Sequence, residues 1–322
     1  PQDRPLYASQ PSRIGERGNS ITRINPLNGE IGASVYVGSE PNQLALSDDG
    51  KTLYIALDGA FSIRRYNTET QTAGIQFSIG RGQSVNANDA PYNASDLAVA
   101  PGNPDLLAVA RYLPGISPPG VGVAIYNNGV RLPNTGPGHS SAANFLAFSN
   151  SAAMLYGGGY DEGLRTFTVN ESGVTDNTGN GTSFEVKDLK FENNLIFTST
   201  GRVINSETRA LLGTFFGVNT PAFVPVTEAG RVLYAEKENS SSNITIKAYD
   251  ISTFLQIGSL TIPNVGYDVI PTSLIRYGTN GLAMRTSNNQ IYLIQSSLIP
   301  TGEPLPPPGG TPTVTPTPSP TI

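Results

Sequence analysis

The side chains that could do acid–base chemistry in this sequence are few, and they lie in polar stretches. The 322 residues include one histidine, His139, within the segment Gly138–Ala142. Carboxylates occur in comparable polar stretches, among them Glu185 and Asp268. A histidine and two carboxylates that lie close together at the mouth of a channel could act as a general acid and a general base. The competing interpretation is an exposed histidine among solvated carboxylates, and the residues alone leave both open.

Metal chemistry has weaker support in the sequence. There is no cysteine, and one histidine cannot complete the usual ligand sets of zinc or copper. Calcium needs clustered oxygen ligands, and the best candidates are Asp176, Asn177 and Asn180 in a turn rich in Asn and Gly. Because such a stretch is more commonly only a turn, we expect neither a metal nor a cofactor.

Motifs for a nucleophile or for phosphate binding are missing from the sequence. Neither a G-x-S-x-G turn nor a G-x-x-x-x-G-K-[ST] loop occurs. Gly157–Gly159 follow a predicted strand without a helix after them, so we expect a close approach of two backbones there rather than a phosphate site. A non-enzymatic protein is therefore favoured over an enzyme.

Charge and composition restrict the partners. Twenty basic residues against 25 acidic ones give a net charge of −5, and no basic patch stands out. We therefore expect no nucleic-acid partner. No apolar run approaches the ~20 residues that span a bilayer, so no membrane span is expected. Glycans stay among the partners to consider, because tyrosines in or near predicted loops could stack on sugars: Tyr92, Tyr112, Tyr160 and Tyr267.

The elements that would position these side chains are short strands. Alternating or fully apolar runs, bounded by Gly, Pro, Asn and Asp, recur along the chain without helical periodicity. In the clearest unit the predicted strands are Leu44–Ser47, Thr52–Ala56, Ser62–Tyr66 and Ala73–Ile79. Asp48–Gly50 should join the first two as a hairpin turn.

One turn recurs seven times in the sequence. A β-branched or aromatic run ends in Asn, Asp or Gln, whose side chain can bond the backbone two residues on. The spacing of roughly 35 to 60 residues is close to the repeat of a four-stranded propeller blade. The seven positions are Asn25, Asn67, Asn127, Asn170, Asn205, Asp250 and Gln295. We therefore predict an all-β fold for residues 1–300, a seven-bladed β-propeller of four-stranded antiparallel blades.

The two ends of this region do not supply complete blades. Residues 6–38 and residues 272–297 supply three strands each, which predicts a vacant inner-strand position beside Leu6–Ser9. Residues 301–322 alternate Thr or Ser with Pro, a pattern that favours an extended tail. One tail segment could occupy the vacant edge in its own molecule or in a neighbour: Thr311, Pro312, Thr313, Val314 and Thr315.

The tail also indicates where the protein works. Thr/Pro tracts resemble the linkers and stalks of secreted microbial proteins, so we expect an extracellular or cell-surface location. Candidate glycosylation sites are the sequon asparagines and the tail threonines: Asn93, Asn170, Asn180, Asn239, Asn243, Thr311, Thr313, Thr315 and Thr317.

The strand–turn–strand segment Asp49–Ala56 resembles the YVTN-type β-propeller repeats. Such repeats occur in surface-layer and other extracellular microbial proteins and in propeller lactonases. The resemblance covers about residues 5–300 and is clearest over residues 40–80. It implies a propeller fold and a cell-surface location, but no particular activity.

Three functions are compatible with these observations. The favoured one is an extracellular structural or adhesive propeller, a surface-layer component or filament subunit. It would self-assemble through its tail, with other copies of itself or cell-surface components as partners. The second is a propeller hydrolase, lactonase-like or glycan-cleaving, whose active site lies at the mouth of the central channel beside His139. The third is a glycan-binding module tethered by the tail.

Overall fold

The computed structural model describes residues 4–84, 87–136, 143–159, 163–179, 182 and 184–300. Within these ranges the chain forms β-strands and short 3₁₀ segments, which confirms the predicted all-β class. The 3₁₀ segments are η1 (Ser12–Arg17), η2 (Asp58–Ala60) and η3 (Thr227–Ala229). No helix in these ranges is long and apolar enough to cross a membrane.

The strands form small antiparallel sheets in chain order, numbered here 1 to 7. Sheet 1 contains β1 (Leu6–Gln10), β2 (Ser20–Ile24) and β3 (Ile31–Tyr36). Sheet 2 contains β4 (Pro41–Leu46), β5 (Thr52–Leu57), β6 (Ser62–Asn67) and β7 (Thr72–Ser78). Sheet 3 contains β10 (Asn93–Ala100), β11 (Asn103–Tyr112), β12 (Gly120–Asn127) and β13 (Val130–Thr135). Sheet 4 contains β14 (Phe145–Phe148), β15 (Met154–Gly158), β16 (Arg165–Asn170) and β17 (Gly173–Asp176).

The second half of the chain repeats this plan. Sheet 5 contains β18 (Leu189–Glu192), β19 (Leu195–Thr198), β20 (Arg202–Asn205) and β21 (Leu211–Thr214). Sheet 6 contains β22 (Phe223–Val226), β23 (Arg231–Lys237), β24 (Ile244–Asp250) and β25 (Gln256–Ile262). Sheet 7 contains β26 (Pro271–Tyr277), β27 (Gly281–Thr286) and β28 (Ile291–Gln295).

Sheets 3 and 4 are joined into one eight-stranded sheet. A single parallel residue pair, Asn134 with Gly173, links β13 to β17. The two end strands of this sheet, β10 and β14, lie next to each other, so the sheet nearly closes on itself. A separate hairpin of β8 (Arg81–Ser84) and β9 (Ala87–Pro91) precedes β10 and was not predicted from the sequence.

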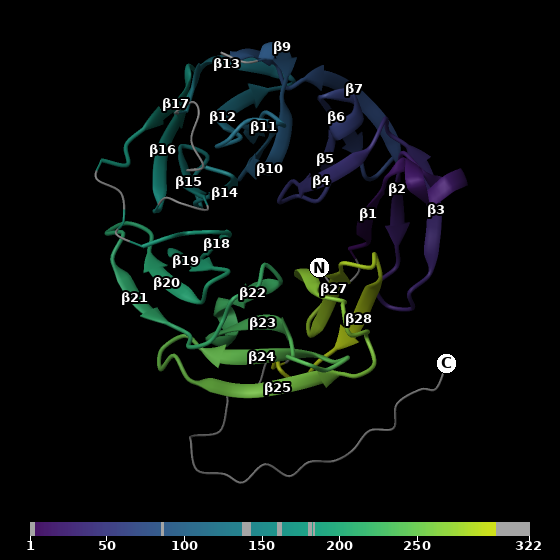
Figure 1. The fold of residues 1–322 in the computed structure, drawn as a ribbon, viewed down its shortest axis with the longest axis vertical. Helices are drawn as coiled ribbons and strands as arrows, with labels where there is room; N and C mark the ends of the chain where they lie inside the picture. The colour runs from purple at the N-terminus through teal and green to yellow at the C-terminus, as the bar shows by residue number, and fades with distance from the viewer. Residues whose placement is uncertain are drawn as a thin grey trace.

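The sheets follow one another around a common axis, as Figure 1 shows. The strands β4, β10, β14, β18 and β22 lie nearest the axis, and β26 lies beside β22. These six are called inner strands below. The strands β7, β13, β21 and β25 lie at the rim and are called outer strands. In sheets 2, 3, 5 and 6 the chain therefore runs from the axis to the rim strand by strand.

The recurrent turn predicted from the sequence is confirmed at five of its seven positions. At each, a side-chain oxygen accepts the backbone N–H two residues on, at 2.8 to 3.0 Å. These positions are Asn25, Asn67, Asn170, Asn205 and Asp250. The four strands predicted in the clearest unit match β4 to β7 to within a few residues.

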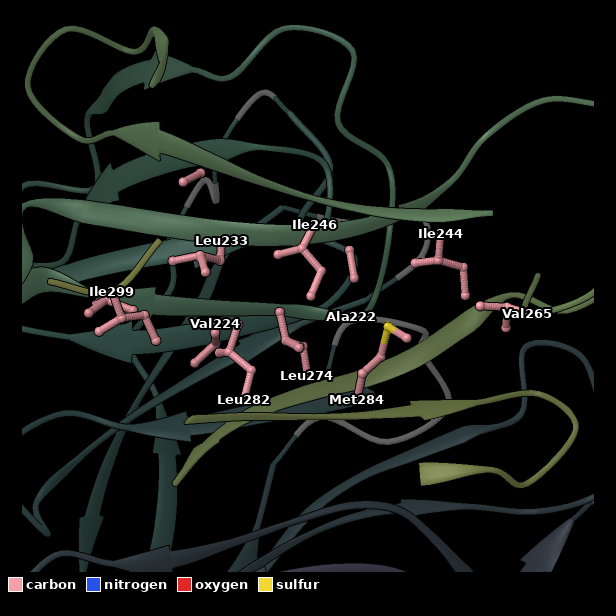
Figure 2. Close-up of a cluster of buried hydrophobic side chains, with 13 residues drawn as sticks. Ala222, Val224, Leu233, Ile244, Ile246, Val265, Leu274, Leu282, Met284 and Ile299 are labelled. Atoms are coloured by element: carbon pink, nitrogen blue, oxygen red, sulfur yellow. The ribbon is translucent and has the colours of Figure 1, made fainter. Parts of the chain in front are cut away.

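Apolar side chains fill the seams between neighbouring sheets. In the largest cluster, Leu233 and Ile246 of sheet 6 pack against Leu274, Leu282 and Met284 of sheet 7 (Figure 2). All five are buried, and burial of such side chains contributes roughly 1.5 to 3 kcal/mol each. The seams, rather than the separate sheets, therefore hold most of the core.

The predicted close approach at Gly157–Gly159 is confirmed at Gly158. A Cβ atom built on Gly158 would lie 2.6 Å from the carbonyl oxygen of Val186, which no side chain could tolerate. The backbone of β15 thus touches the segment that leads into sheet 5. A phosphate site is not needed to explain this run of glycines.

The two terminal sheets each have three strands, but different strands are missing. In sheet 1 the recurrent turn at Asn25 follows β2, so β2 corresponds to a third strand and β1 to a second strand. The contacts between sheets agree with this assignment. The strand β1 lies beside β4, the inner strand of the next sheet, just as the second strand β5 lies beside the inner strand β10. The strand β3 lies beside the outer strand β7. In the described part of the chain, β1 pairs with β2 alone, and its edge toward the axis is free.

The ring closes between sheets 7 and 1 by packing of side chains. Leu6 and Ile24 of sheet 1 lie against Tyr277 and Ala283 of sheet 7. Among the described residues no strand pairing joins the two sheets. In sheet 7, β26 occupies the inner position, and no strand pairs with the outer side of β28 among the described residues.

Candidate functional site along the axis

Three ionisable side chains meet among the inner strands. Asp96 lies in β10, Lys190 lies in β18, and Asp188 directly precedes β18. Asp188 and Lys190 are two residues apart, so their side chains leave the same face of the chain. All three are partly buried.

Lys190 connects three sheets near the axis. Its ammonium Nζ donates to the carbonyl oxygen of Phe223 in β22 at 2.5 Å and to that of Leu274 in β26 at 3.2 Å. Nζ also lies 4.9 Å from the centre of the Phe223 ring, within the range of a cation–π interaction. The lysine of sheet 5 thus holds the inner strands of sheets 6 and 7.

Asp96 makes a similar connection between sheets 3 and 4. One carboxylate oxygen accepts the backbone N–H of Leu97 at 2.8 Å, and the other accepts that of Leu146 in β14 at 2.7 Å. Hydrogen bonds from backbone N–H groups stabilise the ionised carboxylate. This carboxylate therefore joins two inner strands at the seam where the eight-stranded sheet nearly closes.

Burial shifts the pKa of each group in this cluster. It raises the pKa of Asp96 to about 7, against the opposing effect of the Leu146 N–H, and the nearby Asp188 raises it further. Burial also raises the pKa of Asp188 to about 6, while Lys190 acts in the opposite direction. The pKa of Lys190 is lowered by burial and partly restored by Asp188 and Asp96.

Such a cluster could exchange protons near neutral pH, which is why perturbed groups mark candidate sites. Its hydrogen bonds, however, go to backbone groups of neighbouring inner strands, so its evident role is to hold the ring together. A comparison with protein-family models gave no match for this chain, and a comparison with curated proteins gave none either.

Of the residues proposed for acid–base chemistry, Glu185 and Asp268 lie on two exposed loops of the described structure. His139 lies outside the described residues. Glu185 is exposed on the loop before β18 and pairs with Lys187 at 3.7 Å. Asp268 is exposed on the loop before β26, and sheets 5 and 6 lie between these two loops in chain order. The catalytic role of His139 stays a prediction.

The calcium candidates are engaged in other contacts. One carboxylate oxygen of Asp176 pairs with Arg165 at 2.9 Å, and the other accepts the backbone N–H of Thr178 at 2.9 Å. The side-chain amide of Asn177 donates to Thr168. Asn180 lies outside the described residues. In the described part of the chain no group of three acidic, histidine or cysteine side chains is placed to hold a metal.

The sequons differ in accessibility. Asn93 is 7% exposed within β10, so the folded chain does not present it for glycosylation. Asn170 and Asn239 are exposed, and Asn243 is partly buried. The remaining candidates lie outside the described residues: Asn180, Thr311, Thr313, Thr315 and Thr317.

The axial cluster was missed in the sequence, although a signal for it exists. The same residue pair occurs as Asp96-Leu97 within β10 and as Asp188-Leu189 where β18 begins. The leucine of each pair is buried in a seam, so the aspartate before it must face the other side of the strand. Such an Asp-Leu pair therefore places a charge on the face of an inner strand opposite its buried leucine.

Proposed function

We propose that the ring of sheets is a seven-bladed β-propeller of the YVTN-like extracellular kind, and that it is a structural or adhesive element of the cell surface. In this proposal the C-terminal tail of one copy joins the propeller of the next. The chain would then be a subunit of a surface layer or of an extracellular filament.

The free inner edge of β1 is the observation that carries this proposal. Six sheets supply an inner strand, and sheet 1 begins with a strand of the second position. An unpaired edge offers a row of backbone donors and acceptors, to which an added strand can bind. The neighbouring β4 provides a wall for that strand, since Ser9 of β1 already bonds the Asn42 carbonyl oxygen of β4 at 3.0 Å.

The tail has the composition and the length for this role. Thr313, Val314 and Thr315 favour a strand, and an edge position tolerates the flanking proline. Fourteen residues separate Pro300 from Val314, which corresponds to about 45 Å of extended chain at ~3.3 Å per residue. A tail that binds the next copy makes a head-to-tail contact, and contacts that do not close on themselves propagate into a filament.

The rim of the disc adds a surface for adhesion. Outer strands carry exposed aliphatic side chains, such as Ile75 in β7, Val130 in β13 and Ile257 in β25. These side chains lie on separate sheets, so each would supply a separate lateral contact. Lateral contacts at the rim would complement the axial contacts made by the tail.

Deletion of the tail tests this proposal. We expect the intact chain to form oligomers in light scattering after size exclusion and polymers in negative-stain images, whereas residues 1–300 should stay monomeric. Val314→Asp in the intact chain should also prevent assembly, because it places a charge in the added strand. Ser319→Asp adds the same charge outside the segment and serves as the control. If residues 1–300 form oligomers to the same extent as the intact chain, the proposal is wrong.

A further inference from the structure

A groove of about 530 Å³ lies in the seam between sheets 4 and 5. One wall is the turn between β14 and β15, which includes Asn150, and the other is the turn between β20 and β21, which includes Glu207 and Arg209. Phe191 and Tyr156 also line the groove. Its volume falls within the range of small-molecule sites, roughly 300 to 1,000 Å³.

The groove is open because of one residue in the recurrent turn. In sheets 2, 5 and 6 this turn ends in a residue with positive φ: Gln71 (55°), Arg209 (60°) and Phe254 (59°). In the seam between sheets 5 and 6, Phe254 packs its ring 5.3 Å from that of Phe215. Between sheets 4 and 5, the guanidinium of Arg209 instead donates to the carbonyl oxygen of Thr178.

The corresponding seam between sheets 1 and 2 has a smaller cavity of about 260 Å³, lined in part by Gln71 and Glu69. In these seams the side chain at the end of the turn lies between the two sheets, where Phe254 packs as a ring and Gln71 and Arg209 line a cavity. The seam of sheets 4 and 5 is large enough for a ligand of several rings.

Three polar side chains of the groove have unused hydrogen-bonding capacity. The amides of Asn150 and Asn194 and the carboxylate of Glu207 make no hydrogen bond or ion pair with any described residue. The side chain of Arg209 is directed to the Thr178 carbonyl. The uncommitted groups are thus two amides and one carboxylate, which bind hydroxyl groups well, and the charges of Glu207 and Arg209 balance each other in the groove.

An aromatic surface lies beside these groups. Phe191 stacks on Tyr156 with ring centres 5.7 Å apart and an interplanar angle of 15°. Tyr156 is 4% exposed, and its hydroxyl donates to the carbonyl oxygen of Ser206 at 3.3 Å. Tyr156 is therefore fixed, and the partly exposed Phe191 lies over it with part of its surface open to the groove.

We propose that this groove is a binding site for a neutral carbohydrate chain. Sugars combine vicinal hydroxyls with apolar ring faces, and the groove offers planar amide and carboxylate groups beside an aromatic ring. The site is independent of the tail and of the inner edge of β1.

Isothermal titration of the intact chain with cellotetraose, xylotetraose, mannotetraose and chitotetraose tests this site. We expect at least one of these neutral probes to bind. Glu207→Ala should lower its affinity at least tenfold, because a charged acceptor is lost. Glu171→Ala, an exposed carboxylate in the corresponding turn of sheet 4, is the matched control and should leave the affinity unchanged.

Arg209→Phe provides a second test that does not depend on a single hydrogen bond. Phe254 shows that phenylalanine fits this left-handed position, and its ring fills the equivalent seam. The substitution should therefore abolish binding, while the midpoint of thermal unfolding stays within about 4 °C of the original. Failure of all four probes to bind, or unchanged binding in both Arg209→Phe and Glu207→Ala, would overturn the proposal.

Discussion

Single tyrosines fasten one sheet to the next through hydroxyl–carbonyl hydrogen bonds. Tyr54 of sheet 2 donates to the Pro104 carbonyl oxygen of sheet 3 at 2.8 Å, and Tyr234 of sheet 6 donates to that of Thr198 in sheet 5 at 3.0 Å. A buried tyrosine hydroxyl needs such a partner. Each bond ties side-chain packing in one sheet to the backbone of its neighbour.

Tyr234→Phe should therefore destabilise the fold without a change of shape. The ring of Tyr234 would keep its stacking on Phe223, whose centre lies 5.4 Å away, but the Thr198 carbonyl would lose one of its two donors and keep only the Gly201 N–H. We expect the free energy of unfolding, measured with urea, to fall by about 0.5 to 1.5 kcal/mol, the net contribution of one hydrogen bond. Tyr36→Phe, at a side chain that is 68% exposed, should change it by less than about 0.5 kcal/mol.

At this scale the sequence predicts local contacts better than distant ones. The bonds of Asn67 and Asn205 to their own turns follow from residues two or three positions away. The partners of Tyr54 and Tyr156 lie 50 residues further along the chain. Only the order of the sheets around the axis brings these groups together, and no local pattern encodes it.

Inner strands are tied to one another by charged side chains, so the stability of the ring should depend on pH. Burial raises the pKa of Asp96 from 3.8 to about 7, and that of Asp188 to about 6. Between pH 4 and 7 the folded chain thus holds protons that the unfolded chain releases. By linkage, the unfolding free energy falls as the pH rises through this range.

Asp96→Asn should flatten this dependence. An amide at position 96 cannot ionise, so the part of the pH slope that comes from Asp96 disappears. Urea midpoints measured from pH 4 to pH 8 should fall less with pH in Asp96→Asn than in the original chain. Asp268→Asn, at an exposed loop, is the control and should keep the original slope. An identical slope in Asp96→Asn and the original chain would show that Asp96 is not a buried acid.

Strands that bury a regular apolar pattern are predictable, whereas irregular ones are not. The runs within β4 to β7 alternate or are continuously apolar, and the prediction matched them. The hairpin of β8 and β9 was missed because Arg81–Ser84 and Ala87–Pro91 are mostly polar. The axial charges were missed because the partners of Asp96 and Lys190 in other inner strands, Leu146, Phe223 and Leu274, lie 33 to 84 residues further along the chain.

For the whole molecule, the two ends of the chain decide how the ring is completed. Within the described ranges, sheet 7 packs on sheet 1 through Leu6, Ile24, Tyr277 and Ala283 and shares no strand with it. The sequence predicted three strands at each end and a free position beside β1, because each end shows one strand pattern fewer than the four of a complete unit. It did not predict the single residue pair that joins sheets 3 and 4.

The central claim is that the inner edge of β1 receives the tail of another copy, and cysteine cross-linking tests it most directly. The chain contains no cysteine, so Ser9→Cys in one preparation and Val314→Cys in another each add a single thiol. A disulfide requires Cα atoms about 4.4 to 6.8 Å apart, which adjacent strands satisfy. After mixing and air oxidation, non-reducing electrophoresis should show a dimer that contains both variants. With Thr70→Cys, on an exposed turn of sheet 2, in place of Ser9→Cys, that dimer should be missing. Equal amounts of dimer from the two mixtures, or none from either, would contradict the account.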